Sequence, residues 1–552
     1  MSGHRRLHLT AATPVPAPTP APPYEPPREG FRQPTDGSRW RLATITRSRR
    51  RPSGRVLGWS AGGVLVVLSA VLRLRQFDAG FWIDDGISVG IASHPLREIP
   101  TVLRQDGSPP LYYGLLHGWL ALFGNSAPAA YALSLIFALI SIPVAWWAGR
   151  SLFDARTGWI CAVLAATSPF LTLFSGQARM YTLVVLLSLV AAAAFAHAFV
   201  LRRRALLPVF ALALTLLLYT HGWGLFFGVG CAVAVAPCWW LRSGVERRRL
   251  LKDAVLTFGA AGLAFAPWLP VLAYQVAHTA APWSLAPSRA ELLRITGYVL
   301  GAAIIGPFTL AAAAGLAGER RRRHPERLMV ALVLLTVAAV TLFVGWKVGR
   351  LTHTWAPRYV AVGVGPAVLV AGAGLAGAGR LGILCLLVTA PGWLPLGPTT
   401  ISDKSNVAQA LMRTEVHPRP DDLVLVTQPE LLPVVRYYLG GTPRYASTLG
   451  AVPDAQVMDW RDGLERLRHT PASTLTPLLD RVPPGGRVVV VRPKGAPDQI
   501  AWQQLIHLRT RQWLRVLRDD GRFRPVFRTA RGYRTARLNL VSVLVAERRR
   551  DG

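Results

Sequence analysis

Lysine, cysteine and charge in general are scarce in this sequence of 552 residues. Charged residues make up 16% of the chain, whereas a soluble enzyme carries about 25%. Lysine accounts for only four of the 62 basic residues, an arginine bias that is typical of GC-rich coding and suggests a high-GC bacterium. The four cysteines lie in apolar stretches without a CxxC pair or a histidine cluster, so we predict buried thiols and neither a disulfide framework nor a zinc site.

The sequence is rich in apolar residues. They make up 51% of the chain, and the mean hydropathy is +0.32. Apolar stretches of about 20 residues recur from residue 56 to residue 397, a pattern that predicts a polytopic α-helical membrane protein. The first 50 residues are polar and rich in proline and arginine, which does not resemble a cleavable signal peptide.

The net charge of +33 is concentrated in short arginine clusters beside apolar stretches. The clusters are residues 47–55, 202–204, 242–249 and 319–327. Basic residues next to spans mark the cytoplasmic side of a membrane protein, so we read the charge as a topology signal with contacts to membrane lipids and not as a nucleic-acid site.

The clusters also decide how many spans to expect. Residues 109–124 are apolar but short for a full crossing, so we predict an interfacial or re-entrant helix within a large external first loop, 75–125. With that loop outside and the N-terminus inside, all four clusters lie in the cytoplasm. The eleven predicted spans are 56–74, 126–148, 158–173, 179–201, 205–220, 222–242, 251–273, 296–317, 328–346, 358–377 and 381–397.

Composition divides the chain into three parts. Residues 1–54 predict a disordered cytoplasmic tail rich in proline and arginine, 55–399 the transmembrane domain, and 400–552 an extracytoplasmic α/β domain. In the last part we expect strands within 421–428, 486–493 and 538–547, and helices within 429–441 and 500–517. The glycines of 482–495 predict a turn before a strand, because no phosphate-loop pattern accompanies them.

On this topology, a small set of ionisable residues gathers on the external side. Such residues are costly near a membrane, so each is a candidate for function. They are Asp84, Asp85, Asp106, Arg179, His221 and Arg358.

These residues also have purely structural interpretations. Arg179 and Arg358 are alternatively interfacial anchors, and His221 and Asp106 are alternatively helix caps. The adjacent pair of aspartates is harder to explain in this way, because a helix cap requires one acid and not two.

The order of the motifs resembles a known family. An acidic pair at the first external loop precedes "DGSPPLYYGLLHGWLALFG" (106–124), "SPFLTLFSGQARMY" (168–181), "YTH" (219–221) and "PRYV" (357–360). Over about residues 56–400 this resembles the GT-C glycosyltransferases, specifically bacterial family 39-like members related to protein mannosyltransferases and aminoarabinose transferases. The resemblance implies a multi-span enzyme that transfers a sugar from a polyprenyl-phosphate donor to an envelope glycan, lipid or protein outside the plasma membrane.

The resemblance also implies roles for individual residues. The catalytic base of the family is the first acid of the pair, here Asp84, with Asp85 beside it to orient the acceptor or hold Asp84 ionised. Asp84 would take the proton of an acceptor hydroxyl, and direct displacement would invert the anomeric carbon. Arg179 and Arg358 would hold the donor phosphate, because a guanidinium binds phosphate in a bidentate manner.

The remaining expected contacts lie in the same motifs. His221 would contact the phosphate or, with the acids, hold a divalent cation. Asp106, Tyr181 and Tyr359 are the expected acceptor or substrate contacts. The chain departs from the family at Ser108, where relatives often carry histidine, and at 176–177, where they often carry Gln-Glu, so an expected second carboxylate near Arg179 is missing.

Two other functions fit the same composition. Several spans with polar residues on one side also suit a transporter or lipid flippase, although such proteins usually have internal repeats and polar residues at mid-membrane. A non-catalytic scaffold whose external domain binds a wall polymer is the third alternative. Within the transferase hypothesis, a high-GC bacterium favours mannose or an arabinose-like sugar.

Overall fold

A computed structural model describes residues 54–77, 80–279, 281–292, 294, 312–318, 325–393, 405–412, 417–528 and 540–550. The chain separates into a unit of residues Met1–Gly54 and a unit of residues Arg55–Gly552. The predicted disordered tail coincides with the first unit, and all of it except Gly54 lies outside the described residues.

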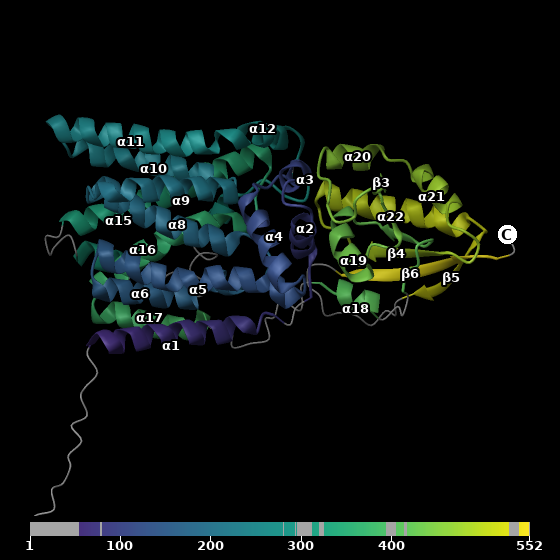
Figure 1. Cartoon of the computed structure of the whole chain (residues 1–552), viewed down its shortest axis with the longest axis horizontal. Coiled ribbons are helices and arrows are strands. Elements are labelled where there is room, and N and C mark those ends of the chain that lie inside the picture. The colour runs from purple at the N-terminus through teal and green to yellow at the C-terminus, as the bar shows by residue number, and fades with distance from the viewer. Residues whose placement is uncertain are drawn as a thin grey trace, which may run out of the picture. The chain divides into compact units, whose positions relative to one another are not determined.

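A bundle of apolar helices forms most of the second unit (Figure 1). Its helices are α1 (Gly54–Leu74), α5 (Ala127–Leu152), α6 (Ala155–Thr167), α7 (Pro169–Ser175), α8 (Tyr181–Phe195) with the π-helix η1 (Ala196–Val200), η2 (Arg204–Leu206), α9 (Leu207–Thr220), α10 (Gly224–Trp240), α11 (Gly244–Phe265), η3 (Ala266–Trp268), α12 (Leu269–His278), α15 (Pro325–Thr352), η5 (Pro357–Val360), α16 (Ala361–Gly377) and α17 (Arg380–Trp393).

Among the described residues, five helices are long and apolar enough to cross a membrane, or six if the bent pair α6 and α7 counts as one span. They include Ala127–Leu152, Tyr181–Val200 and Pro325–Thr352. The predicted spans fall on helices, except 296–317, which lies largely outside the described residues. The protein is therefore a multi-pass helical membrane protein, and the number of eleven spans stays a prediction.

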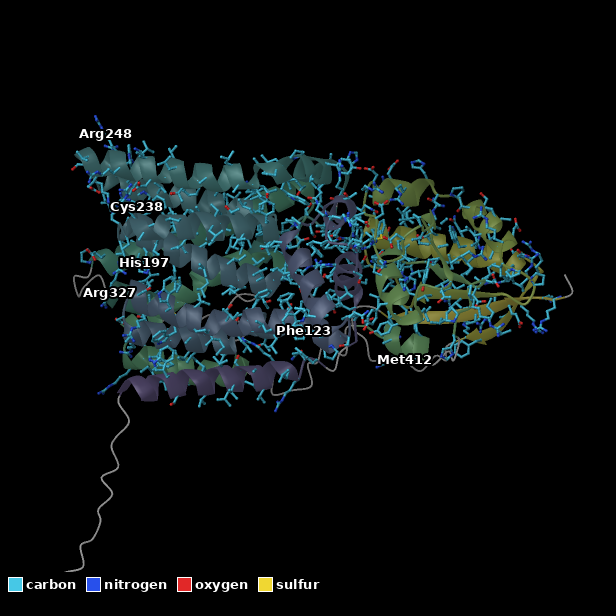
Figure 2. All side chains as sticks on the ribbon, in the orientation of Figure 1. Phe123, His197, Cys238, Arg248, Arg327 and Met412 are labelled. Atoms are coloured by element: carbon cyan, nitrogen blue, oxygen red, sulfur yellow. The ribbon has the colours of Figure 1, made fainter. Side chains whose placement is uncertain are left out.

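Described residues of three arginine clusters form ion pairs or lie at one end of the bundle. Arg204 and Arg202 bind Asp253 of α11 at 2.7 and 2.9 Å, which joins the second cluster to the helix that contains most of the third. Arg327 binds Asp154 at 2.9 Å, which joins the fourth cluster to the α5–α6 connection. Figure 2 shows Arg248 and Arg327 at this end, and we call it the arginine end. The shared end agrees with the predicted topology, while its cytoplasmic orientation stays a prediction.

Short helices cover the opposite end, which we call the site end. They are α2 (Ile83–Ala92), α3 (Ile99–Asp106) and α4 (Leu111–Phe123), all within the predicted external loop (Figure 1). With 13 residues, α4 is about 20 Å long, too short for a hydrocarbon core of about 30 Å. Its length is compatible with the predicted interfacial helix.

The α/β domain contains a six-stranded mixed sheet. The strand order is β3-β2-β1-β4-β6-β5, in which β1 is parallel to β2 and β4 and the other pairs are antiparallel. The strands are β1 (Leu423–Val426), β2 (Arg444–Ser447), β3 (Gly450–Ala451), β4 (Arg487–Pro493), β5 (Phe523–Arg528) and β6 (Val541–Arg548). The helices are α18 (Val407–Met412), η7 (Pro429–Leu431), α19 (Leu432–Leu439), α20 (Gly463–His469), η8 (Ala472–Leu475), α21 (Thr476–Asp480) and α22 (Ala501–Asp519).

The three predicted strands and two predicted helices of this domain are confirmed as β1, β4, β6, η7–α19 and α22. The predicted turn also precedes β4, with Gly485 at φ +78°. The sequence did not predict β2, β3 and β5. Strands β2 and β3 have only four and two residues, and β5 contains Pro525, a residue that argues against a strand in a sequence.

The α/β domain packs against the site end through α2. Gly86 faces Val434 of α19 so closely that a methyl group would clash with it, and Gly90 faces the carbonyl of Gln456 in the same way. Because residues four apart share one face of a helix, the two glycines give α2 a flat face on which the domain rests. Phe81 N–H also donates to the Tyr438 hydroxyl at 2.9 Å.

Candidate active site

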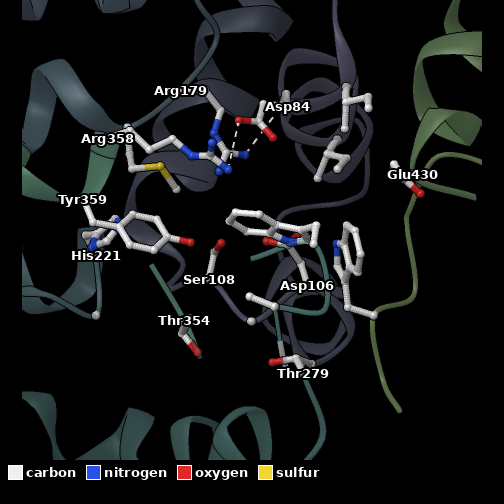
Figure 3. A pocket seen from close by; sticks show the side chains of 18 of the residues that line it. Asp84, Asp106, Ser108, Arg179, His221, Thr279, Thr354, Arg358, Tyr359 and Glu430 are labelled. Carbon is white, nitrogen blue, oxygen red and sulfur yellow. Dashed lines mark hydrogen bonds and ion pairs between the residues drawn. The ribbon is translucent and has the colours of Figure 1, made fainter. Parts of the chain in front are cut away.

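A cavity of about 380 Å³ lies between the site end and the α/β domain (Figure 3). Seven of the eight predicted site residues line it, although they come from segments far apart in the chain. The seven are Asp84, Asp106, Arg179, Tyr181, His221, Arg358 and Tyr359. The fold therefore brings together the motifs that carry the family resemblance.

Asp84 occupies the first turn of α2, which begins at Ile83. An acid in this position is stabilised by the exposed amides and dipole of the helix N-terminus. Its side chain is buried against the cavity, at 8% exposure, and Oδ2 lies 3.6 Å from Nη2 of Arg358. Figure 3 shows Asp84 beside the guanidinium groups of Arg179 and Arg358.

Asp85 does not line the cavity and is fully buried behind it. Its Oδ1 accepts the Ala178 N–H at 2.8 Å, and its Oδ2 accepts the Tyr131 hydroxyl at 3.3 Å. Oδ2 also accepts the Trp82 N–H at 3.4 Å, a cap on the start of α2. Asp85 thus ties the helix that carries Asp84 to the loop that carries Arg179. Its role in orienting the acceptor stays a prediction.

Arg358 begins the helical segment η5–α16 and points into the cavity. Its guanidinium lies over the Trp283 ring, 4.8 Å from the centroid, an arrangement that fixes the plane of the group. Its Nε makes no hydrogen bond of normal geometry among the described residues. A buried guanidinium with an unused donor next to a cavity suits an anionic ligand.

Arg179 follows α7 and precedes α8, where the bent pair of helices ends. Its Nη1 donates to the Ser88 hydroxyl at 3.2 Å and more weakly to the Asp84 carbonyl oxygen at 3.5 Å. The Nε of Arg179 also makes no hydrogen bond of normal geometry among the described residues. Two guanidiniums with unused donors therefore face one cavity beside one carboxylate.

His221 caps the end of α9 and lies between the rings of Tyr181 and Tyr359, at centroid distances of 5.9 and 5.2 Å. Its Nδ1 accepts the Trp223 N–H at 3.1 Å, so Nε2 carries the proton of the neutral ring. Burial, then Arg179 and Arg358, lower the pKa of His221 to about 3. The imidazole is therefore neutral and offers one N–H donor to the cavity. The helix-cap interpretation is also correct for its backbone, since the His221 N–H binds the Leu217 carbonyl.

Asp106 ends α3 on the floor of the cavity, and the Tyr113 hydroxyl donates to it at 3.4 Å. Burial raises the pKa of Asp106, and the nearby Arg179 opposes that effect. The C-cap after it is Gly107 at φ +90°, a conformation that favours glycine. Tyr359 and Ser108 point toward each other across the cavity in Figure 3.

The α/β domain supplies lining residues that the sequence did not predict. They are Gln428, Glu430, Trp460 and Gln503. No motif marked them, because the resemblance covered about residues 56–400. For Gln428, Glu430 and Gln503 the one available signal was their position at or after the ends of the predicted strands 421–428 and 486–493, where ligands bind in parallel sheets. Trp460 carried no such signal.

A divalent cation finds little support here. In the part of the chain that the structure describes, no three His, Cys, Asp or Glu side chains converge as metal ligands. His221 has one nitrogen occupied by a backbone N–H, and Asp84 faces a guanidinium. The residues present therefore suit an anion better than a cation.

Sequence comparisons identify no match, either to a family model or to a curated protein. Solved structures do match. ArnT of Cupriavidus metallidurans in the apo state is 14% identical, with a TM-score of 0.58 over 89% of this chain and 98% of that one. The same protein bound to undecaprenyl phosphate is 12% identical, with a TM-score of 0.52 over 88% of this chain and 98% of that one. The oligosaccharyltransferase of Archaeoglobus fulgidus in the apo form is 12% identical, with a TM-score of 0.50 over 88% of this chain and 76% of that one.

Proposed function

Because the chain has the fold of the GT-C superfamily of membrane glycosyltransferases, we propose that it transfers a sugar from a polyprenyl-phosphate donor to an acceptor on the external side of a bacterial plasma membrane. One observation carries the proposal. Asp84 shares a cavity with Arg179 and Arg358, whose Nε donors are unused among the described residues. A similar structure, that of ArnT, has been solved with undecaprenyl phosphate.

The guanidiniums bind the donor phosphate. Arg358 lies 3.6 Å from Asp84, beyond normal hydrogen-bond distance, so a phosphate can compete for it without breaking a tight pair. Phosphate accepts several hydrogen bonds in the plane of a guanidinium, and burial strengthens them. The neutral His221 can add an N–H without adding charge.

Asp84 acts as the general base. It takes the proton of an acceptor hydroxyl while the hydroxyl oxygen attacks the anomeric carbon. The bond from that carbon to the phosphate oxygen breaks, and the polyprenyl phosphate leaves with its charge on Arg179 and Arg358. The leaving group needs no proton, so a single carboxylate suffices, and direct displacement inverts the anomeric carbon. The sequence favours mannose or an arabinose-like sugar.

The two alternative functions receive less support. A transporter usually carries its polar site near mid-membrane, whereas these residues lie at one end of the bundle. A scaffold gives no reason for buried guanidiniums beside a cavity. Among the described residues, we find no internal repeat that would favour a transporter and no polymer-binding surface that would favour a scaffold.

A transfer assay tests the proposal. The full chain is reconstituted in liposomes with polyprenyl phosphate carrying labelled mannose or arabinose. The acceptor is the combined glycan, glycolipid and protein fraction of a deletion strain, which retains the unmodified acceptor. We expect label in one fraction with inverted anomeric configuration, and loss of the same product from envelopes of the strain by mass spectrometry. An unchanged envelope and no transfer would contradict the proposal, and retention would contradict its single-displacement mechanism.

A further inference from the structure

The cavity is open on one side to the carboxyl end of the sheet in the α/β domain. Gln428 and Glu430 directly follow β1, and Gln503 lies at the start of α22, the next element after β4. Strands β1 and β4 are neighbours and parallel, so the segments that follow them leave the sheet at the same edge.

This edge is a topological switch point. From β1 the chain continues through α19 to β2 on one side of β1, and it later returns as β4 on the other side. In open α/β sheets, ligands bind in the crevice that forms where the strand order reverses, outside the carboxyl ends of the strands. The usual ligand crevice of this domain therefore faces the membrane-domain cavity.

Glu430 is the charged residue at that crevice. Its side chain is buried, at 3% exposure, although it lines the cavity. Its Oε1 accepts from Gln428 Nε2 at 2.8 Å and from Trp502 Nε1 at 3.2 Å, which fixes the carboxyl group. Its Oε2 makes no hydrogen bond of normal geometry among the described residues.

A buried carboxyl oxygen without a hydrogen bond of normal geometry is unfavourable, because its lost hydration is not replaced. Packing does not require it here, because a leucine would fill the space without that penalty. Burial raises the pKa of Glu430, while Gln428, Trp502 and Gln503 oppose the shift by favouring the charged form. The arrangement resembles a ligand site, in which part of a fixed carboxyl group is kept for a partner.

We propose that Glu430, with Gln428, Gln503 and Trp460, forms the acceptor subsite of this enzyme and that it binds a saccharide. The inference rests on the proposed function. A carboxyl group accepts from hydroxyl donors, and each carboxamide both donates and accepts, which matches the hydroxyl groups of a sugar. Trp460 supplies a flat apolar surface for a sugar ring. A lipid chain in the same place would leave the Glu430 oxygen without a partner.

The subsite gives the two domains separate tasks. The membrane domain holds the donor and the base, and the α/β domain holds the acceptor on the opposite wall of the same cavity. In Figure 3, Glu430 lies on the far side of the cavity from Arg179 and Arg358. The acceptor hydroxyl would then approach Asp84 from the side away from the phosphate, as an inverting displacement requires.

The test compares Glu430→Gln with Glu465→Gln in the full chain. Gln keeps the shape of residue 430 and removes its charge, and Glu465 is an exposed glutamate of the same domain, paired with His469. With the glycan fraction of the deletion strain as acceptor, we expect Glu430→Gln to raise the acceptor KM about tenfold or more, because a hydrogen bond to a charged group contributes about 1.5–3 kcal/mol. The donor KM should not change, and Glu465→Gln should match the wild type.

A second measurement does not depend on turnover. Hydrogen exchange at residues 427–432 should slow when the glycan fraction is added to the wild type, and Glu430→Gln should abolish the protection. Trp502→Phe, which removes one hydrogen bond to Glu430, should weaken it. A change confined to kcat or to the donor KM would overturn the subsite, and protection by the protein fraction alone would overturn the saccharide. If no sugar is transferred yet the protection is seen, the proposed function fails while the saccharide site stands.

Discussion

The two ends of the bundle use the same chemistry, an aspartate facing two arginines, in opposite ways. At the arginine end, Arg204 binds Asp253 through two donors, at 2.7 and 3.1 Å, and Arg202 adds a third contact at 2.9 Å. At the site end, Oδ2 of Asp84 lies 3.6 Å from Nη2 of Arg358. Three contacts of 2.7 to 3.1 Å therefore hold Asp253, whereas the Asp84–Arg358 ion pair is longer, at 3.6 Å.

The difference separates structural from functional ion pairs. The close pair joins η2 to α11, and Nε and Nη1 of Arg202 also make no hydrogen bond of normal geometry among the described residues. The pair at the site end borders a cavity, and Nε of Arg358 and Nε of the neighbouring Arg179 make no hydrogen bond of normal geometry among the described residues. A pair of this kind gains little stability in the absence of a ligand, because charges taken out of water repay their desolvation only in close geometry. The substitutions below test this distinction.

Replacing the two aspartates should have opposite effects, and these are the largest we expect. Asp84→Asn keeps the shape and removes the base, so turnover should fall by about 10² or more while the protein stays at normal levels in the membrane. Asp253→Asn should lower the melting temperature and the amount of folded protein but leave turnover per folded molecule near normal. Transfer assays and thermal unfolding of the purified chain measure both. Wild-type turnover in Asp84→Asn would remove the base assignment.

Asp85 adds a third case to this comparison. The sequence suggested a role beside the base, but its oxygens bind the Ala178 N–H and the Tyr131 hydroxyl. Asp85→Asn replaces an acceptor by a donor that faces other donors. It should therefore reduce stability more than Asp84→Asn does, and reduce turnover less, when both variants are measured as folded protein.

Arginine to lysine changes at the site end should have the next largest effect. Lysine keeps the charge but cannot offer a planar fork to a phosphate. Arg179→Lys and Arg358→Lys should each raise the donor KM by about tenfold, the equivalent of one charge-assisted hydrogen bond. Arg204→Lys at the arginine end is the control, and it should leave the donor KM unchanged. Normal donor affinity in both site-end variants would favour the interfacial-anchor interpretation.

Glycines on the neighbouring helices α2 and α4 test whether the close contact between α2 and the α/β domain matters for acceptor binding. Gly90 of α2 faces the Gln456 carbonyl without room for a methyl group, whereas Gly118 of α4 has nothing within 4 Å. Gly90→Ala should force α2 from the α/β domain and raise the acceptor KM, and Gly118→Ala should do neither. Protease cleavage between the domains and acceptor titration report both effects. Equal behaviour of the two variants would show that the domain contact on α2 is not needed for acceptor binding.

The sequence identified the membrane-domain residues that line the cavity better than it predicted the fold around them, and their roles stay predictions. Its residues could be found because ionisable side chains are rare in apolar surroundings, and Asp84, Arg179 and Arg358 stood out for that reason. The number of spans could not be fixed in the same way. Helices such as α6 and α7 divide one apolar stretch at Pro169, and such bends do not appear in hydropathy.

The contribution of the α/β domain could not be predicted, because it depends on long-range packing. Glu430 is an ordinary glutamate in a Gln-Pro-Glu turn, and only its place beside the cavity gives it meaning. The roles of Asp84 and Asp85 differ for the same reason. The sequence presents two adjacent acids, and the rotation of one residue along α2 turns one toward the cavity and the other toward Ala178.

The smallest effect concerns pH at the contact between α2 and the α/β domain. His94 Nε2 lies 2.8 Å from Asp454 and Nδ1 lies 2.9 Å from the Gly90 carbonyl, so the protonated ring donates at both nitrogens. The hydrogen bond to Asp454 raises the pKa of His94, against the effect of burial. The pair therefore stabilises the contact fully below the ordinary histidine pKa of about 6.5 and loses this contribution as pH rises through the raised value.

The Asp454 side chain is 41% exposed, which limits the effect to about fivefold. The protection factors of the α2 amides, which correct for base-catalysed intrinsic exchange, should fall by no more than that between pH 6 and pH 9, and His94→Gln should remove this fall. His278→Gln, at the more exposed pair with Asp462, is the control and should retain it. A pH dependence that survives in His94→Gln would assign it to another group.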